Sequence, residues 1–293
     1  MFIVTQKEKK VGMLIITLFA IAILTTTLFS GCTENKPAGT TATLSLGGST
    51  TVQPIADACA QAFMVLHSNI TVQVYGGGSG VGIKGVAGGT YDIGDASREA
   101  KASDLTDIQG VTLSDLVAHK IALDGIAIIV SKEIYNAGVT NISKTQLKGI
   151  YNRTITNWQT LGGPNEAIFV VGRDTSSGTY TSINDMLGLN QSTQILDVAR
   201  SENAQVKAAV AGQNNGIGYV GLGFVDANTP AVKLNGISPS ISTVTDNTYP
   251  LSRSLYMYTK GPASGVEQMF IDFVLSTDGQ KIVEQEEFVP LPK

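Results

Sequence analysis

Four turns rich in serine, threonine and glycine each follow a strand-like run of the sequence. They are residues 47–51 (GGSTT), 76–80 (GGGSG), 94–99 (GDASRE) and 172–179 (GRDTSSGT). The first, second and fourth also open a predicted helix, whose N-terminus exposes unpaired N–H groups and the positive end of the dipole. Glycine lets a ligand approach these N–H groups, and hydroxyls add neutral donors. Convergence of the turns would therefore create a site for an oxyanion.

Two of these turns also carry an arginine, whose planar guanidinium suits phosphate-like anions. Arg173 lies between the strand-like AIFVV and the predicted helix start SSGT, which favours contact with a ligand. Arg98 is followed by Glu99, so pairing with a nearby acid is the simpler interpretation for Arg98 taken alone.

Strand-like and helix-like runs alternate along the chain, which predicts an α/β fold with largely parallel sheets. The predicted strands include residues 70–77, 91–97, 116–132, 167–173, 216–225 and 251–260. The predicted helices include residues 52–67, 79–89, 142–152, 203–213, 264–276 and 277–285, with Ser143 as a candidate cap. No glycine- or proline-rich linker divides the chain, so two domains would have to be joined by structured crossings.

Seven motifs in this order resemble the phosphate-binding lipoproteins of ABC-type phosphate importers. They are GGSTTVQP, GGGSGVGIKGV, YDIGDASREAK, LDGIAIIV, VGRDTSSGT, GIGYVGLGF and YPLSRSLYMYT, which together span about residues 44–290. The resemblance implies a two-lobed periplasmic-binding-protein-like α/β fold with a ligand cleft between the lobes. On this basis we expect lobe 1 to comprise residues 44–123 and 222–293, and lobe 2 to comprise residues 124–221.

The resemblance also implies a set of phosphate ligands, taken over residue by residue. The ligand positions are Thr50, Thr51, Ser79, Ser97, Arg98, Arg173, Ser177, Gly178 and Thr179. Ser97 stands where some members of the family have an aspartate that accepts the phosphate proton. The acceptor role therefore passes to Asp124 or Asp95, and we expect such a carboxylate to favour phosphate over sulfate.

The first 31 residues resemble a lipoprotein signal peptide. A basic stretch and a long apolar run lead into LFSGC, which ends at Cys32, the expected site of lipidation. An uncleaved anchor helix is the alternative, and in either case residues 32–43 would form a tether. We therefore expect a monomer anchored by lipid to the outer face of the cytoplasmic membrane.

Composition excludes several classes of protein. The whole chain carries a net charge of −4, so no basic surface for nucleic acid is expected. Besides Cys32 the chain has one cysteine, Cys59, and its two histidines, His67 and His119, lie outside the polar turns, which argues against a metal site.

The predicted function is capture of inorganic phosphate and its delivery to an ABC importer, with no cofactor and no enzymatic activity. Residues 80–85 (GVGIKG) match the G-x-G-x-x-G motif of dinucleotide-binding enzymes, but the preceding GGGS lengthens the turn and makes this interpretation weaker. A secreted hydrolase is also disfavoured, because neither Ser79 nor Ser177 lies in a G-x-S-x-G motif. The remaining alternative is a binding protein for another tetrahedral oxyanion, namely sulfate, molybdate or tungstate.

Overall fold

The computed structural model describes residues 41–292 of the chain. The predicted signal peptide, the lipidation site Cys32 and most of the predicted tether lie outside the described residues. Within the described range, no helix has both the length and the apolar character needed to cross a membrane.

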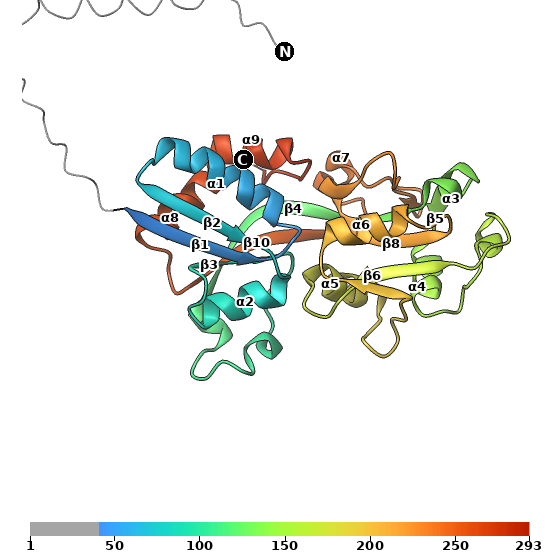
Figure 1. Ribbon diagram of the computed structural model, residues 1–293, viewed down its shortest axis with the longest axis horizontal. Helices are drawn as coiled ribbons and strands as arrows, with labels where there is room; N and C mark the ends of the chain where they lie inside the picture. Colours follow the sequence, from blue (N-terminus) through green and yellow to red (C-terminus); the bar gives the residue numbers. More distant parts are fainter. Residues whose placement is uncertain (1–40, 293) are drawn as a thin grey trace, which may run out of the picture. The chain divides into compact units, whose positions relative to one another are not determined.

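An eight-stranded sheet runs through the described part of the chain, in the order β2-β1-β3-β10-β4-β8-β6-β7 (Figure 1). Its strands are β1 (Ala42–Gly48), β2 (Ile70–Tyr75), β3 (Ile93–Ala96), β4 (Leu116–Val130), β6 (Phe169–Arg173), β7 (Val198–Arg200), β8 (Gly216–Gly221) and β10 (Ser252–Lys260). A separate parallel pair is formed by β5 (Asn141–Ile142) and β9 (Lys233–Leu234).

The sheet is mixed, whereas the sequence predicted largely parallel pairing. Strands β1, β2 and β3 are parallel to one another, and so are β6, β7 and β8. The long β4 and the late β10 lie antiparallel to each other between these two groups. β10 also pairs antiparallel with β3, and β4 pairs antiparallel with β8. The prediction missed the antiparallel pairing of β4 and β10 because a buried antiparallel strand and a buried parallel strand carry similar apolar runs.

Nine helices are described. They are α1 (Gln53–Leu66), α2 (Ser79–Ala87), α3 (Lys132–Asn136), α4 (Lys144–Tyr151), α5 (Gly178–Leu187), α6 (Asn203–Ala211), α7 (Ile241–Thr245), α8 (Gly265–Leu275) and α9 (Thr277–Gln285). The predicted cap Ser143 is confirmed, because its hydroxyl accepts the N–H of Gln146 at the start of α4. The short α3 and α7 were not predicted, since five residues give too little periodicity.

Two large hydrophobic cores lie along the sheet, and β4 contributes to both. Ile121 and Ala122 of β4 belong to a core built with α1, α8 and α9. Ile126 and Ile128 of the same strand belong to a second core around Trp158. The second core also takes in residues from 232 to 251, which the sequence had assigned to lobe 1. One continuous sheet serves both cores, so no break in the sheet marks a boundary between lobes. The division into lobes therefore remains a prediction.

The glycines of residues 82–94 allow α2 to lie against the sheet. A methyl group on Gly82 would meet the carbonyl oxygens of Asp95 and Gly47 at 2.5 and 2.6 Å. A methyl group on Gly94 would in turn meet the Gly82 carbonyl. The backbone of α2 therefore lies directly against the backbones of β1 and β3. This contact places Ser79, the first residue of α2, at the carboxyl ends of the parallel strands.

Candidate anion-binding site

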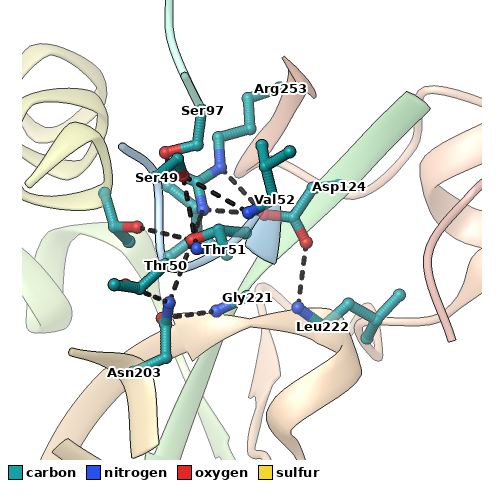
Figure 2. A network of polar contacts seen from close by, with 12 residues as sticks. Ser49, Thr50, Thr51, Val52, Ser97, Asp124, Asn203, Gly221, Leu222 and Arg253 are labelled. Atoms are coloured by element: carbon teal, nitrogen blue, oxygen red, sulfur yellow. Dashed lines mark hydrogen bonds and ion pairs between the residues drawn. The ribbon is translucent and has the colours of Figure 1, made fainter. Parts of the chain in front are cut away.

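The four turns meet at the carboxyl ends of β1, β2, β3 and β6. Three of them lead directly into helix N-termini, those of α1, α2 and α5. The hydroxyl of Ser49 accepts the N–H groups of Thr51 and Val52 and so fixes the first turn (Figure 2). Parallel pairing brings the carboxyl ends of β1, β2 and β3 to one edge. Three antiparallel pairings separate β3 from the second parallel group, so β6 runs in the opposite direction and its carboxyl end faces those of the first group.

Thr50 and Thr51 are buried where the first turn meets residues from the other half of the sheet. The Thr51 hydroxyl lies 3.3 Å from that of Thr179 in the fourth turn. Asn203, at the start of α6, donates its amide N–H groups to the hydroxyls of Thr50 and Thr51 at 3.2 and 3.0 Å (Figure 2). The amide oxygen of Asn203 accepts the N–H of Gly221, so the side-chain orientation is fixed at both ends.

Ser79 and Ser97 form a second buried pair of hydroxyls. Their oxygens are 3.2 Å apart, and the hydroxyl of Ser79 also accepts the backbone N–H of Ser97 at 2.9 Å. Gly178 faces this pair, because a methyl group added there would collide with both hydroxyl oxygens. A larger residue at position 178 would therefore push the fourth turn away from the second and third turns.

The fourth turn supplies a helix N-terminus and an arginine. Ser177 caps α5 by accepting the N–H of Tyr180, and Thr179 is buried in the first turn of the helix. Arg173 is almost fully buried, and its guanidinium donates to the carbonyls of Arg200 and Ser201 and to the hydroxyl of Thr50. Its Nη1 has no hydrogen-bond partner among the described residues.

Arg173 carries a positive charge that no carboxylate within residues 41–292 neutralises by direct contact. Its hydrogen-bond acceptors are carbonyl and hydroxyl oxygens. Burial lowers the pKa of Arg173 to about 10, which leaves the guanidinium charged at neutral pH. A buried cation in this state favours an anionic ligand.

Arg98 does not join the cluster. Two of its guanidinium nitrogens bind both carboxylate oxygens of Asp104, each at 2.7 Å, and one of them also donates to the Glu99 carbonyl. The pairing with an acid that the sequence favoured for this residue is therefore observed, although the acid is Asp104 and not Glu99.

The two candidate acceptors, Asp124 and Asp95, lie in different surroundings. Asp124 is inside the polar cluster, but its Oδ1 accepts the N–H of Leu222 at 2.9 Å and its Oδ2 accepts Nε of Arg253 at 2.8 Å (Figure 2). Burial raises the pKa of Asp124, and Arg253 opposes that rise. Asp95 is buried without a hydrogen-bond partner among the described residues, and burial raises its pKa well above 3.8.

Sequence reasoning missed two residues of the cluster, Asn203 and Arg253. Arg253 stands near the start of the strand-like LSRSLYMYTK, where a charged residue on a largely buried strand needs a partner. Asn203 opens a predicted helix, a position where asparagine is common and therefore carries little signal.

As a whole, the cluster presents hydroxyls, amide donors, helix N-termini and two guanidinium groups, an arrangement suited to a small oxyanion. Surface clefts border it. One of about 160 Å³ is lined by Thr50 and Asn203, and one of about 390 Å³ is lined by Arg98 and Arg253. Within residues 41–292, no group of three or more His, Cys, Asp or Glu side chains could hold a metal ion.

Comparisons with known proteins agree with this arrangement. Residues 33–278 match the model of the PBP superfamily domain. The phosphate-binding protein PstS of Bacillus subtilis is 32% identical over 260 residues, which cover 88% of this chain and 83% of that protein. PstS of Borreliella burgdorferi is 32% identical over 283 residues, covering 92% and 96% of the two chains.

A solved structure from Clostridium perfringens, with bound phosphate, is also similar. It is described as a phosphate ABC transporter substrate-binding protein, and it is 32% identical with a TM-score of 0.79. The match covers 85% of this chain and 100% of that one. The expected fold class, a periplasmic-binding-protein-like α/β fold, is thereby confirmed, and the relatives are named as binding proteins. The chain belongs to the PBP superfamily and, within it, to the family of the PstS phosphate-binding proteins.

Proposed function

We propose that this protein binds inorganic phosphate outside the cytoplasm and delivers it to the membrane subunits of an ABC importer. The observation that carries the proposal is the buried guanidinium of Arg173, which donates to two backbone carbonyls and the Thr50 hydroxyl and contacts no carboxylate of residues 41–292. The names of the PstS relatives and the phosphate bound in the Clostridium perfringens structure support phosphate as the anion.

Eight residues of the four turns are proposed as ligands. They are Thr50, Thr51, Ser79, Ser97, Arg173, Ser177, Gly178 and Thr179. Their burial in one cluster and the convergence of three helix N-termini support this assignment. The sequence-based assignment of Arg98 as a ligand finds less support, because two of its nitrogens are bound to Asp104.

We propose two lobes that close over the anion, one around each large core. The crossing of β4 from one core to the other supports this division. The placement of residues 232–251 in the second core supports a boundary later than residue 221 for the second lobe.

The proposal also includes a monomeric protein held at the membrane by lipid on Cys32. The sequence LFSGC after a basic and apolar leader supports it. Mass spectrometry of the membrane fraction should find a chain that begins at a lipid-modified Cys32, and Cys32→Ala should abolish that species. An intact leader with an unmodified Cys32 would contradict lipidation without bearing on anion binding.

Calorimetric titration of the full chain in detergent with phosphate, sulfate and molybdate tests the ligand. We expect phosphate to bind most tightly. Because both oxygens of Asp124 already accept N–H groups, the site is rich in donors, and this favours a fully ionised oxyanion as the second candidate. Tighter binding of sulfate or molybdate would replace phosphate as the ligand, and binding of none of the three would refute the function.

A further inference from the structure

We propose that Arg253 is a further anion-binding residue of this site and that Asp124 is the residue that positions its guanidinium. The inference rests on the proposed function, since it adds a residue to the same anion site. It concerns a part of the chain, the start of β10, that lies far in sequence from the four turns.

Arg253 and Asp124 face each other across two antiparallel strands. They are direct register partners on β10 and β4, and their side chains are 4% and 0% exposed. Nε and Nη2 of Arg253 both lie 2.8 Å from Oδ2 of Asp124. With Oδ1 held by the N–H of Leu222, the carboxylate is fixed by protein donors on both oxygens.

The rest of the guanidinium points to the proposed phosphate ligands. Nη1 of Arg253 donates to the hydroxyl of Ser97 at 3.2 Å, and Nη2 donates to that of Thr51 at 3.3 Å. These two hydroxyls belong to different turns, so Arg253 bridges the first and third turns (Figure 2). Both bonds are longer than a typical charge-assisted bond of about 2.8 Å, which leaves these N–H groups free to turn toward a stronger, anionic acceptor.

Arg253 also determines which way a neighbouring hydroxyl can donate. A hydroxyl has one proton and two lone pairs. The oxygen of Thr51 accepts from Asn203 and from Arg253, so both lone pairs are used and its proton can only be donated. Thr50 is in the same state, because its oxygen accepts from Arg173 and Asn203. The two arginines and Asn203 thus turn both threonines into donors, and the proton of Thr51 is available to the Thr179 hydroxyl at 3.3 Å or to an anion.

The charge balance favours the same role. The hydrogen-bonded cluster contains two guanidinium groups, Arg173 and Arg253, and one carboxylate, Asp124. Asp124 reduces the cost of burying Arg253 in the empty site, and the pair still presents donor N–H groups to the ligand. The cluster therefore keeps one uncompensated positive charge for the anion.

The direct test is titration of the full chain with inorganic phosphate after substitution of Arg253. Arg253→Gln should raise the dissociation constant by about 10- to 150-fold, the range for a charge-assisted hydrogen bond. Arg253→Lys keeps the charge but loses the fork and should fall between that variant and the unmutated protein. Arg153→Gln, which removes an arginine from a partly exposed pair with Asp197, is the matched control and should leave the affinity unchanged.

A double variant distinguishes the loss of an anion ligand from misfolding. Arg253→Gln alone leaves Asp124 buried without its cation, whereas Asp124→Asn with Arg253→Gln removes both charges and retains the shape. Thermal melting should show that the double variant folds, and its phosphate affinity should still be at least about tenfold weaker. If the unmutated protein binds phosphate and both Arg253→Gln variants bind it equally well, Arg253 is not a ligand.

The positioning role of Asp124 has its own readout. Asp124→Asn should change the phosphate dissociation constant by a factor that differs at least about threefold between the unmutated and the Arg253→Gln backgrounds, because contacting residues couple. Equal factors in both backgrounds would overturn the positioning role. Failure of the unmutated protein to bind phosphate would instead count against the proposed function itself.

Discussion

At the scale of single residues, Arg173 shows most clearly how the site is prepared for an anion. It donates to two backbone carbonyls and one hydroxyl, so its orientation is fixed without a counter-charge. Arg253 differs, since Asp124 compensates it. A buried cation without a carboxylate costs free energy in the empty protein, and the ligand recovers that cost on binding.

Substitution of Arg173 should therefore weaken binding and leave folding intact. We expect Arg173→Gln to raise the phosphate dissociation constant by about 10- to 150-fold in calorimetry, because a charge-assisted hydrogen bond contributes about 1.5–3 kcal/mol. The thermal midpoint without phosphate should not fall, since the variant removes a buried charge. An unchanged dissociation constant would mean that the fourth turn serves only as a helix cap.

The buried carboxyl of Asp95 leads to a prediction about how the stability of the folded protein depends on pH. Its folded-state pKa is raised well above 3.8 by burial and, less strongly, by Asp57. The folded protein therefore retains a proton that the unfolded chain releases, and stability falls as pH rises above about 4. Asp95→Asn removes this loss, so the variant should melt at a higher temperature than the unmutated protein at pH 7.

The comparison at low pH is the control for this prediction. Near pH 3 the carboxyl is largely protonated in both states, so the difference in melting temperature should shrink. A difference that stays constant from pH 3 to pH 7 would show that Asp95 does not titrate on unfolding.

At the scale of elements, the close contact between α2 and the sheet depends on glycine at particular positions. Gly82→Ala would drive a methyl group into the Asp95 and Gly47 carbonyls, whereas at Gly80 of the same helix the nearest atom is 3.4 Å away. Overpacking of this kind costs about 1–3 kcal/mol. We expect denaturant unfolding to show that loss for Gly82→Ala, and little change or a small gain for Gly80→Ala. Equal effects of the two substitutions would contradict the close packing.

The sequence predicted the long elements well because their apolar patterns are strong. The helix at 52–67 and the strand at 116–132 appear as α1 and β4 with ends shifted by a few residues. The convergence of the turns could also be anticipated, since four turns of similar composition each follow a strand-like run. By contrast, the pairing of Arg253 with Asp124 depends on the antiparallel register of β10 and β4, which no local pattern reveals.

At the scale of the whole described chain, the strand β4 links the two cores through one backbone. Residues 116–125 pair with β10, and residues 126–130 pair with β8. A strand shared in this way can bend at the change of partner while each core stays packed, which is the usual structural basis of hinge closure. Gly125 lies at this change of partner.

Closure around the ligand is the prediction that belongs to this scale. The turns of the two parts are in contact, because the N–H of Gly80 donates to the Ser176 carbonyl at 2.9 Å and Lys101 pairs with Asp185 at 2.8 Å. The exposed ion pair contributes only about 0–1 kcal/mol, and the buried hydrogen bonds of Thr50 and Thr51 to Arg173 and Asn203 also join the two parts. An anion that touches residues of both parts, Thr51 and Thr179 among them, stabilises the closed state and not the open one.

We therefore expect small-angle scattering to give a smaller radius of gyration with saturating phosphate than without it. Arg173→Gln should need a correspondingly higher phosphate concentration for the same compaction, which separates ligand-driven closure from an effect of added salt. An unchanged radius of gyration in a sample that calorimetry shows to be saturated would rule out closure by lobe movement.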